Sequence, residues 1–381
     1  MSSLPFILAS ATTGWITLGT AAVLKLTREK PVRAADRPLA PVTVLKPLCG
    51  ADPSLRENLE TFFVQDHPTY ELLFGVERAD DAAIPVVESL IADYPLVRAR
   101  IIVHVPPRGE NPKVRNLRGI VGHASFDLVL ISDSNVRAPR GYLSDAVREL
   151  AAHPDNGLVT NLFVGAGGGT LGADLEAVQL TGFCASGAAL PTIVGDAAVI
   201  GKSMLFSRTT FESLGGFARV ADVLAEDYVI GKMFQHGGFR VVLAPTVLDN
   251  VLGAITVRGF FDRQLRWSML RARLRPSTFL LEPLTSPLAM LPFAWTFMGA
   301  WAALWMVALL VVRDALPWAA LKGLRGIHKP LALSIVREVF ALAIWVCTPF
   351  KRHASWRGHK VRVGAGTMLF HEIDPAAVRG A

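Results

Sequence analysis

Acidic residues directly after an apolar run are the first candidates for chemistry in this sequence. Asp133 follows Ser132 at the end of the strand-like run 127–131 and is separated from Asn135 by a single serine. Hard divalent cations such as Mg²⁺ and Mn²⁺ take oxygen ligands and bridge diphosphate oxygens, so Asp133 is a candidate metal ligand. Because Asn135 stands where a second acid would complete an Asp-any-Asp pattern, an Asx turn after a strand is the alternative.

A second acidic pair, Glu226 and Asp227, precedes the helix-like segment 229–236. A carboxylate here could act as general base on an acceptor hydroxyl, which must lose its proton as it attacks. The alternative is an acidic cap that interacts favourably with the positive end of the helix dipole.

Glu77 and Asp81 follow the strand-like run 71–76. An acid at the carboxyl end of a strand can accept hydrogen bonds from a uracil or ribose edge, which makes both residues candidates for nucleotide binding. A solvated acidic loop is the alternative.

Lys113 and Asn116 lie at the start of a helix-like segment, where free backbone N–H groups favour anions such as a nucleotide phosphate. The alternative is an ordinary helix start, with Asn111 as the N-cap and Pro112 at the first helical position.

Arg263 and Arg266 fall on nearly the same face of a helix, and so do Arg263 and Trp267. Guanidinium groups fork onto phosphate oxygens, and a Trp side chain offers a stacking face. A basic amphipathic helix beside a membrane is the alternative, supported by the arginines at 271, 273 and 275. Both interpretations can hold together.

The elements that must position these residues alternate between strand-like and helix-like from about residue 41 to residue 250. We expect strands at 42–45, 71–76, 100–105 and 127–131, and helices at 55–64, 84–93 and 115–123. This alternation predicts an α/β fold, with a Rossmann-like, mixed but mainly parallel sheet and helices on both faces. Ligands of such sheets bind beyond the carboxyl ends of the strands, where the candidate residues lie.

The composition places part of the chain in a membrane. The chain is 51% hydrophobic with a mean hydropathy of +0.38, too high for an ordinary soluble enzyme of 381 residues.

Residues 4–24 are uncharged and long enough to cross a bilayer, and no positive segment precedes them. We therefore expect a permanent anchor over residues 1–26 rather than a cleaved signal. Basic residues follow the anchor, and the positive-inside rule then places the next domain, residues 40–275, in the cytoplasm: Lys25, Arg28, Lys30, Arg33 and Arg37.

Further membrane or interfacial helices are expected in residues 276–352, before a basic tail at 353–381. Residues 288–312 are an apolar run of spanning length, interrupted by Pro292. Residues 331–350 are another, but Arg337 and Glu338 within it are costly at that depth unless they are paired or face a polar interior. Spanning and interfacial placements of this segment both stay open.

The net charge of +7 and the pI of about 9.5 fit an anionic membrane surface or a nucleotide diphosphate. Nucleic acid is not an expected partner, because the basic residues cluster beside the apolar runs and no standard nucleic-acid module is present. Three scattered cysteines argue against a disulfide framework and a zinc site, and favour a reducing compartment. The oligomeric state stays open.

Together these motifs resemble those of family-2 glycosyltransferases with the GT-A fold, and within them the ceramide glucosyltransferase group. The likeness runs from residues 42–48 through 58–68 to Trp267 and continues more loosely to residues 355–357, so it covers most of the chain. The pattern of the group is three aspartates followed by Gln/Arg-any-any-Arg-Trp, which Asp81, Asp133, Asp227 and residues 263–267 match. Asn135 departs from the second acid of many family-2 enzymes, a departure shared in kind by the ceramide group.

The resemblance implies an inverting hexosyltransferase that moves a sugar, glucose before others, from a UDP-sugar to the primary hydroxyl of ceramide. The enzyme would be an integral membrane protein with its catalytic domain on the cytoplasmic face. The Ala- and Arg-rich composition favours a bacterial inner membrane.

The resemblance also implies roles for the motif residues. It places a nucleotide site at Asp81, with Lys113 and Asn116. It places Mg²⁺ or Mn²⁺ and the diphosphate at Asp133, and the catalytic base at Asp227. The remaining polar residues belong to the acceptor and diphosphate side: Glu226, Arg263, Arg266 and Trp267.

Other functions stay open at this point. A hopanoid or another lipid could be the acceptor, with UDP-N-acetylglucosamine or another UDP-sugar as donor. A polysaccharide synthase or a polyisoprenyl-phosphate sugar transferase is a further alternative, although processive synthases usually carry more spans. The last alternative is a non-catalytic membrane lipid-binding protein, against which the retained aspartates and the Arg-Trp pair argue.

Overall fold

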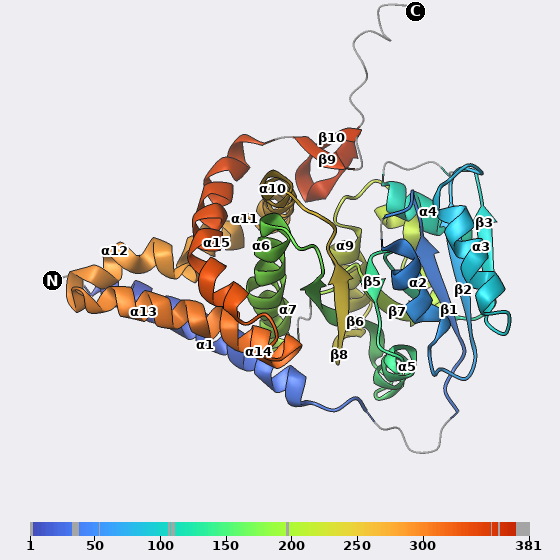
Figure 1. Cartoon of the computed structure of the whole chain (residues 1–381), viewed down its shortest axis with the longest axis horizontal. Helices are drawn as coiled ribbons and strands as arrows, with labels where there is room; N and C mark the ends of the chain where they lie inside the picture. Colours follow the sequence, from blue (N-terminus) through green and yellow to red (C-terminus); the bar gives the residue numbers. More distant parts are fainter. Residues whose placement is uncertain are drawn as a thin grey trace, which may run out of the picture.

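The computed structural model describes residues 3–32, 38–52, 54–105, 107, 111–195, 198–351, 353–356 and 359–370. A part built around a sheet lies on one side of the molecule and a part built from apolar helices lies on the other (Figure 1). The predicted basic residues Arg33 and Arg37, the end of the likeness at Arg357, and residues 371–381 of the predicted tail lie outside the described residues. The domain boundaries expected from the sequence stay predictions.

An eight-stranded sheet has the strand order β3-β2-β1-β4-β7-β6-β8-β5. Strands β3, β2, β1 and β4 are parallel to one another, as are β6 and β8, whereas β7 and β5 run antiparallel to their neighbours. The predicted mixed, mainly parallel sheet is therefore confirmed. The strands are β1 (Val42–Pro47), β2 (Tyr70–Val76), β3 (Arg98–Val103), β4 (Leu128–Ser132), β5 (Val136–Arg137), β6 (Asn156–Ala166), β7 (Ser203–Ser207) and β8 (Arg240–Val251).

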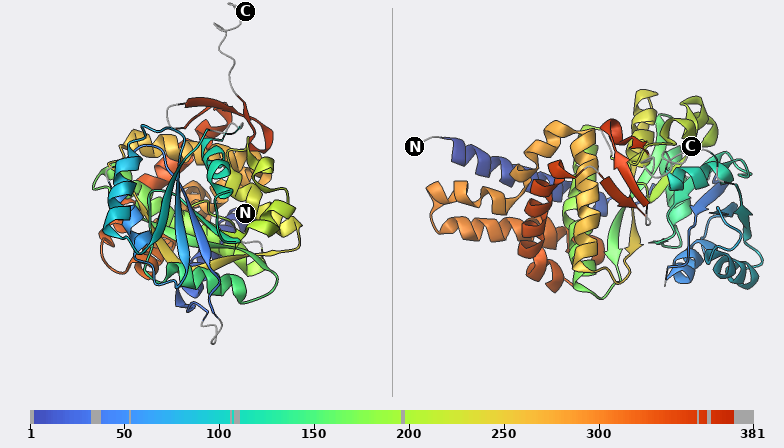
Figure 2. Two further views of the ribbon diagram at one scale, coloured as in Figure 1. Left: turned by 90° about the vertical axis from the view of Figure 1, so that its right-hand side faces the viewer. Right: turned by 90° about the horizontal axis from the view of Figure 1, so that it is seen from above.

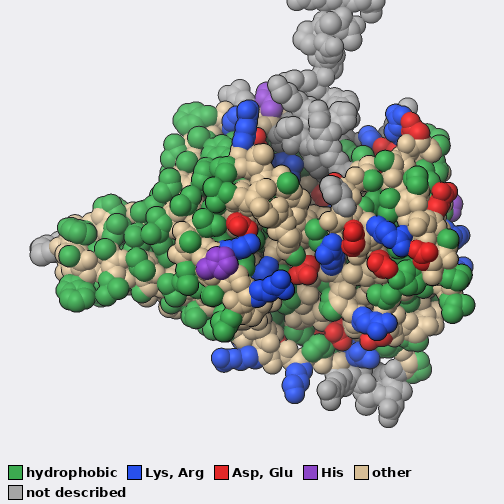
Figure 3. Space-filling view, in the orientation of Figure 1, with side chains coloured by type: hydrophobic (Ala, Val, Ile, Leu, Met, Phe, Trp, Pro, Cys, Tyr) green, Lys and Arg blue, Asp and Glu red, His purple; other side chains and the backbone are tan. Residues whose placement is uncertain are grey.

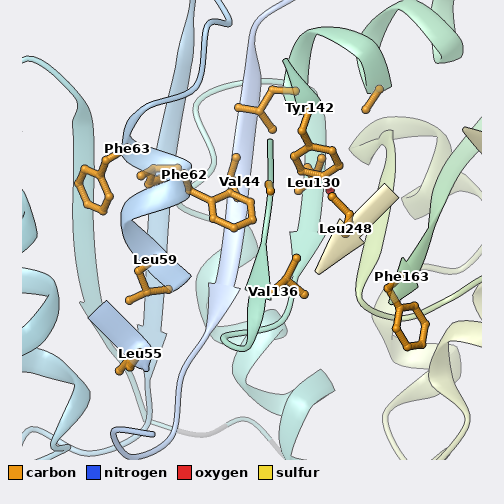
Figure 4. Close-up of a cluster of buried hydrophobic side chains, with 14 of the residues drawn as sticks. Val44, Leu55, Leu59, Phe62, Phe63, Leu130, Val136, Tyr142, Phe163 and Leu248 are labelled. Atoms are coloured by element: carbon orange, nitrogen blue, oxygen red, sulfur yellow. The ribbon is translucent and has the colours of Figure 1, made fainter. Parts of the chain in front are cut away.

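Helices cover both faces of this sheet, as predicted. Alternate residues of β1 and β4 point to opposite faces, because successive side chains of a strand do so. Val44 and Leu130, which pair in register, pack with α2 (Leu55–Phe63), α3 (Ala83–Asp93) and α5 (Tyr142–Ala151) in one buried cluster (Figure 4). Leu45 and Ile131 pack with α4 (Pro112–Val121), α8 (Arg208–Ser213) and α9 (Glu226–His236) in another. Continuous apolar strands thus fix the central layer, and the polar residues are left for the strand ends.

Four helical stretches in the described part of the chain are long and apolar enough to cross a membrane. The predicted N-terminal helix is one of them, and it spans Leu4–Arg28 (α1). A second stretch, Leu171–Val194, was not predicted from the sequence. It comprises α6 (Leu171–Gln179), the π-helical turn η1 (Leu180–Cys184), α7 (Ala185–Ala189) and η2 (Leu190–Val194). The other two are Trp301–Lys322 and His328–Phe350.

Three apolar helices project together from the rest of the molecule: α1, α12 (Pro287–Met298) and α13 (Trp301–Leu310) (Figures 1 and 2). The Thr12 hydroxyl donates to the Leu284 carbonyl at 2.7 Å, and the Trp305 indole donates to the Thr13 hydroxyl at 3.0 Å. Figure 3 shows a largely hydrophobic surface over this projection, whereas charged side chains gather over the sheet-based part. This projection, called the apolar projection below, is the surface best suited to lipid.

The expected single run over residues 288–312 is wrong, because the chain turns back at Gly299. Gly299 has φ 56° and ψ −139°, a conformation that side chains other than glycine rarely adopt. Pro292 lies inside α12 without ending it. The 12 residues of α12 are about 18 Å long, well short of a bilayer core of about 30 Å. Helices α12 and α13 therefore form a helical hairpin instead of one continuous helix.

A buried ion cluster joins the two C-terminal helical stretches. It contains Arg313 and Asp314 of the π-helical turn η5 (Val311–Ala315), and Arg337 and Glu338 of α15 (His328–Cys347). Arg313 lies 2.8 Å from both Asp314 and Glu338, and Arg337 lies 2.5 Å from Glu338. The charges predicted to be costly at this depth are thus paired. The chain between them is α14 (Leu316–Lys322).

The last described residues form a small antiparallel sheet of β9 (His353–Trp356), β10 (His359–Val363) and β11 (Leu369–Phe370). This sheet packs on the loop before α9. The Leu224 amide donates to the Thr367 carbonyl at 3.0 Å, and the Leu369 amide donates to the Asp222 carbonyl at 2.8 Å. The C-terminal segment therefore supports the chain just ahead of Glu226.

Candidate functional site

The carboxyl ends of the parallel strands bring several of the predicted site residues to one edge of the sheet. Asp133 comes directly after β4, and Lys46 near the end of β1 lies beneath it. The Lys46 ammonium donates to the Ser132 hydroxyl and to the Asp133 carbonyl, each at 3.0 Å. Burial lowers the pKa of Lys46 well below its ordinary value, although the Asp133 carboxylate opposes this. Lys46 thus fixes the backbone that carries the Asp133 side chain.

The Asp133 carboxylate lies between two lysines. Its oxygens are 2.9 Å from the ammonium of Lys113 and 3.2 Å from that of Lys202. Burial alone would raise the pKa of Asp133, but the two ammonium groups outweigh it and hold the pKa far below the ordinary value. Lys202 also donates to the Asn135 amide oxygen at 2.9 Å. The edge therefore holds a compact, charge-paired cluster.

Lys113 ties Asp133 to the start of α9. Its ammonium lies 3.2 Å from Glu226 and donates to the Gly201 carbonyl at 2.7 Å. Burial would lower the pKa of Lys113, but Asp133 and Glu226 raise it above its ordinary value. Burial raises the pKa of the Glu226 carboxyl, and Lys113 opposes that shift. The other oxygen of Glu226 accepts from the Asn111 amide at 3.1 Å.

Asp227 lies beside this cluster at the first turn of α9. Its carboxylate accepts hydrogen bonds from the Gly201 and Tyr228 backbone amides, both at 2.8 Å. The approach is close, because a Cβ at Gly201 would lie 2.9 Å from the Asp227 carboxylate and would displace that side chain. Asp227 is half-buried, whereas Glu226 is buried and bonded through both oxygens. Asp227 is therefore the more accessible of the two acids.

Asp81 and Glu77 lie at the end of β2, two strands from β4. The Asp81 carboxylate accepts from the Gly50 amide at 3.0 Å and from the Ala83 amide at 2.8 Å, which links the loop after β1 to the start of α3. Glu77 forms a bidentate salt bridge with Arg115, in which both nitrogen–oxygen distances are 2.8 Å. Because α4 carries Arg115 as well as Lys113, one helix connects Glu77 to the Asp133 cluster.

Asn116 faces backbone rather than open space. Its amide nitrogen donates to the Leu48 carbonyl at 3.1 Å and to the Gly75 carbonyl at 3.0 Å. The side chain is buried, and a Cβ at Gly75 would collide with it. Asn116 thus holds the ends of β1 and β2 together. The predicted cap is also present, since the Asn111 side chain accepts from the Lys113 and Val114 amides.

Helix α10 (Val257–Leu274) carries the predicted Arg-Gln-Leu-Arg-Trp segment past the same edge. Arg263 lies 3.6 Å from the buried carboxylate of Glu176 on α6, and Gln264 donates to that carboxylate at 3.0 Å. Burial lowers the pKa of Arg266, as does Arg263, while Glu176 and Glu226 oppose this. Trp267 packs on the main hydrophobic cluster. The arginines therefore lie on the side of the cluster that faces the apolar helices.

Asp133 is not part of a preformed metal cage, so a metal here would have to displace a lysine contact and take further ligands from a substrate. Both its oxygens contact lysines, and Asn135 already accepts from Lys202. No group of three His, Cys, Asp or Glu side chains in the described ranges could hold a metal ion. Mg²⁺ is commonly bound by one or two carboxylates together with substrate phosphates, so one carboxylate suffices when a diphosphate supplies further oxygens.

Sequence reasoning missed three residues of this site: Lys46, Lys202 and Glu176. A single lysine within the apolar run of β1 was a signal for Lys46, since a buried lysine needs a specific partner. Nothing in the spacing pointed to Lys202 or Glu176, which come from a turn before β7 and from the apolar stretch 171–194.

Comparisons with known proteins agree with this arrangement. A model of the family described as Glycosyl transferase family 21 matches residues 4–369. Ceramide glucosyltransferase 1 of Caenorhabditis elegans is 31% identical over 272 residues, covering 70% of this chain and 58% of the relative. The ceramide glucosyltransferase of Komagataella phaffii is 27% identical over 421 residues, covering 84% of this chain and 82% of the relative.

The matches to two nematode relatives, of which the second is Ceramide glucosyltransferase 3, span only 58% and 54% of their length. The resemblance to the ceramide glucosyltransferase group is confirmed, although the matched family carries the number 21 rather than 2.

Among solved structures, the mannosyltransferase PcManGT from Pyrobaculum calidifontis, in complex with GDP-Man and Mn²⁺, is similar with a TM-score of 0.52 and 21% identity. The similarity covers 91% of this chain and 98% of the mannosyltransferase. At this identity it speaks for the fold alone. The predicted GT-A arrangement of a mixed, mainly parallel sheet between helices is confirmed.

Proposed function

Because the chain belongs to glycosyl transferase family 21, we propose that it transfers glucose from UDP-glucose to the primary hydroxyl of ceramide at the cytoplasmic face of a membrane. The observation that carries this proposal is the cluster of Asp133, Glu226 and Asp227 around Lys113, next to helices able to enter a bilayer. A soluble donor would reach the cluster from the strand ends. A lipid acceptor would reach it from the apolar helices.

In the proposed reaction, the acceptor hydroxyl attacks the anomeric carbon while UDP leaves from the opposite side, which inverts the configuration. Asp227 takes the hydroxyl proton, and its half-buried carboxylate is supported by the Gly201 amide. The acids at the end of β2, Glu77 and Asp81, contact the nucleoside. Lys113 contributes positive charge on the same side, and Asn116 holds the backbone of this region in place.

Mg²⁺ or Mn²⁺ would be held at Asp133 with the donor's diphosphate, where it would neutralise negative charge. Of the two lysines, Lys202 is the one whose contact with Asp133 would be exchanged. Arg263 and Arg266 add positive potential from α10, and Trp267 keeps that helix against the core. Groups placed in this way stabilise a leaving diphosphate electrostatically.

The proposal is tested with membranes that contain the full chain, a panel of UDP-sugars and fluorescent ceramide, with products identified by mass spectrometry. A hopanoid is included as a rival acceptor, and chelator is added in parallel to test the metal. We expect one hexose on ceramide, with UDP-glucose the preferred donor and chelator inhibitory. Transfer to the hopanoid alone, or to no lipid at all while UDP binds, would contradict the proposal.

The role of Asp227 is tested by Asp227→Asn, which should lower kcat by about 10²–10⁴-fold, because the acceptor proton then has no base. The affinity for UDP, measured by titration calorimetry, should stay unchanged. Asp262→Asn on α10 is the matched control, since Asp262 is exposed and pairs with Arg258 one turn earlier on the same helix. Near wild-type turnover by Asp227→Asn would exclude Asp227 as the base.

A further inference from the structure

A pocket lies between α10, η1, α15 and the short turn η4 (Glu282–Thr285), on the side of α10 that faces the apolar helices. Its cavity volume is about 50 Å³, and the space continues into the open surroundings. A cavity of this size holds a few polar groups rather than a whole small molecule. Gln264 of the predicted Arg-Gln-Leu-Arg-Trp segment lines it.

The floor of this pocket is polar and not fully satisfied. Arg337 is 1% exposed, and its Nε atom has no hydrogen-bond partner within the described residues. Gln264, which also lines the pocket, uses its amide nitrogen for Glu176. Arg271 and Glu282 form an ion pair at the rim. Buried polar atoms without partners are rare in native proteins, so the Arg337 Nε donor is left for a ligand.

The walls are apolar and aromatic: Phe183, Phe260, Leu342 and Trp345 line the pocket. The Trp345 indole donates to the Phe279 carbonyl at 2.9 Å, which fixes the ring. Convergent polar groups on the floor and apolar walls around them suit an amphiphile whose small head carries hydroxyl or amide groups.

The pocket adjoins the catalytic cluster through α10. Gln264 lies between them, since it lines the pocket and donates to Glu176. The neighbouring Arg263 pairs with the same carboxylate, and Arg266 is influenced by both Glu176 and Glu226. A head group held against Gln264 would therefore be next to the residues that face Glu226.

Two π-helical turns meet at this pocket. Phe183 belongs to η1 and Arg313 to η5, and both side chains line it. Gly182 of η1 approaches Asp314 of η5 so closely that a Cβ would lie 2.4 Å from the carboxylate. Insertions of this kind inside helices are frequent at functional sites, because they redirect side chains at a local energetic cost. Here they turn Phe183 and Arg313 toward one space.

We propose that this pocket binds the polar head of the acceptor lipid, with its amide and secondary hydroxyl against Gln264 and Arg337 and its chains leaving over the apolar walls. The inference rests on the proposed function, because it places that acceptor. Held there, the lipid would direct its primary hydroxyl past Gln264 toward Asp227.

The test compares Ala341→Phe with Ala343→Phe on α15. Ala341 lines the pocket, whereas Ala343 two residues later is exposed. Filling the pocket should raise the KM for fluorescent ceramide by about tenfold or more, because the head group no longer fits. The KM for UDP-glucose should not change in either variant. Acceptor KM values within twofold of wild type in both variants would overturn the proposal.

A second measurement uses the unaltered chain, so that a misfolded variant cannot decide the matter. A ceramide with a photoreactive group near its amide is irradiated with the protein in nanodiscs, and labelled peptides are sequenced. We expect label on α10 and on residues 337–345, removed by excess ceramide but not by excess phospholipid. Label confined to α1 and α12, or removed by phospholipid alone, would contradict an acceptor site.

The two measurements separate this inference from the proposed function. If the wild-type chain transfers no sugar to ceramide while the photolabel still reaches the pocket, the proposed function fails and the lipid site stands. If ceramide is glucosylated while Ala341→Phe keeps its acceptor KM and the label lies elsewhere, the function stands and the pocket assignment fails.

Discussion

At the scale of single residues, Asp133 is central to the site, because its carboxylate balances the charge of the Lys113 and Lys202 ammonium groups. Asp133→Asn leaves Lys113 and Lys202 without this partner and should lower the free energy of unfolding by about 2 kcal/mol, since removing one member of a buried pair leaves a charge uncompensated. Chemical denaturation of the detergent-solubilised chain, followed by Trp fluorescence, measures the loss. Asp80→Asn, which disrupts an exposed pair with Arg78, is the control and should change nothing measurable.

The pH dependence of that difference checks its electrostatic origin. The pKa of Asp133 in the folded chain is lowered below its ordinary value of 3.8. Its contribution to the free energy of unfolding is therefore fully present above pH 3.8. It is lost only as the pH falls toward the folded pKa. The difference in the free energy of unfolding between wild type and Asp133→Asn should therefore stay constant from about pH 7 to about pH 5. It should become smaller only at lower pH. Narrowing already near pH 6 would mean that the lysines do not lower this pKa.

Residue types and their positions after strands were enough to find the acids of this site, but not their partners. Asp133 and Asp81 were predicted because parallel strands must end at one edge. The contact of Asp133 with Lys202 joins residues 69 positions apart, and no local pattern encodes it. Asn116 was predicted to contact a nucleotide, yet its amide holds two backbone carbonyls, since the sequence did not reveal how closely β1 and β2 approach it. The roles of the site residues stay predictions until tested.

At the scale of elements, the contact between the two π-helical turns should tolerate no added atom. Gly182→Ala places a Cβ against Asp314 and should lower the thermal unfolding midpoint, because overpacking of a tight contact costs about 1–3 kcal/mol. Gly187→Ala, five residues further along the same helical stretch, is the matched control. Nothing lies within 4 Å of a Cβ there, and alanine favours a helix, so its midpoint should hold or rise. Equal midpoints for both variants would contradict a tight contact at Gly182.

The elements of the sheet were predictable because they rest on local signals. Each strand expected before residue 132 is present within two or three residues, and α4 begins at the proline that follows its predicted cap. The apolar helices were less predictable. Residues 171–194 contain the charged Glu176, so the sequence analysis left them within the sheet domain. The hairpin at Gly299 depends on contacts with α1, which the composition does not specify.

At the scale of the whole molecule, apolar surface is concentrated at one end and charge at the other (Figure 3). We therefore expect the full chain to stay in the membrane pellet after washing with high salt and with alkaline carbonate, and to be released by detergent. Immunoblotting of the fractions measures this. A peripheral protein held by its net charge of +7 would leave with salt, which would contradict insertion of the apolar projection.

The N-terminal helix has a mechanical consequence. One half of α1 packs in the apolar projection through Ala9 and Thr13, and the other half packs on α7 through Val23 and Leu26. A continuous helix of 25 residues is a stiff strut between the two. If the apolar projection enters a bilayer, this helix fixes the distance between the membrane and the strand ends. We therefore expect a change in membrane thickness to tilt the sheet-based part as one body rather than to separate it from the apolar projection.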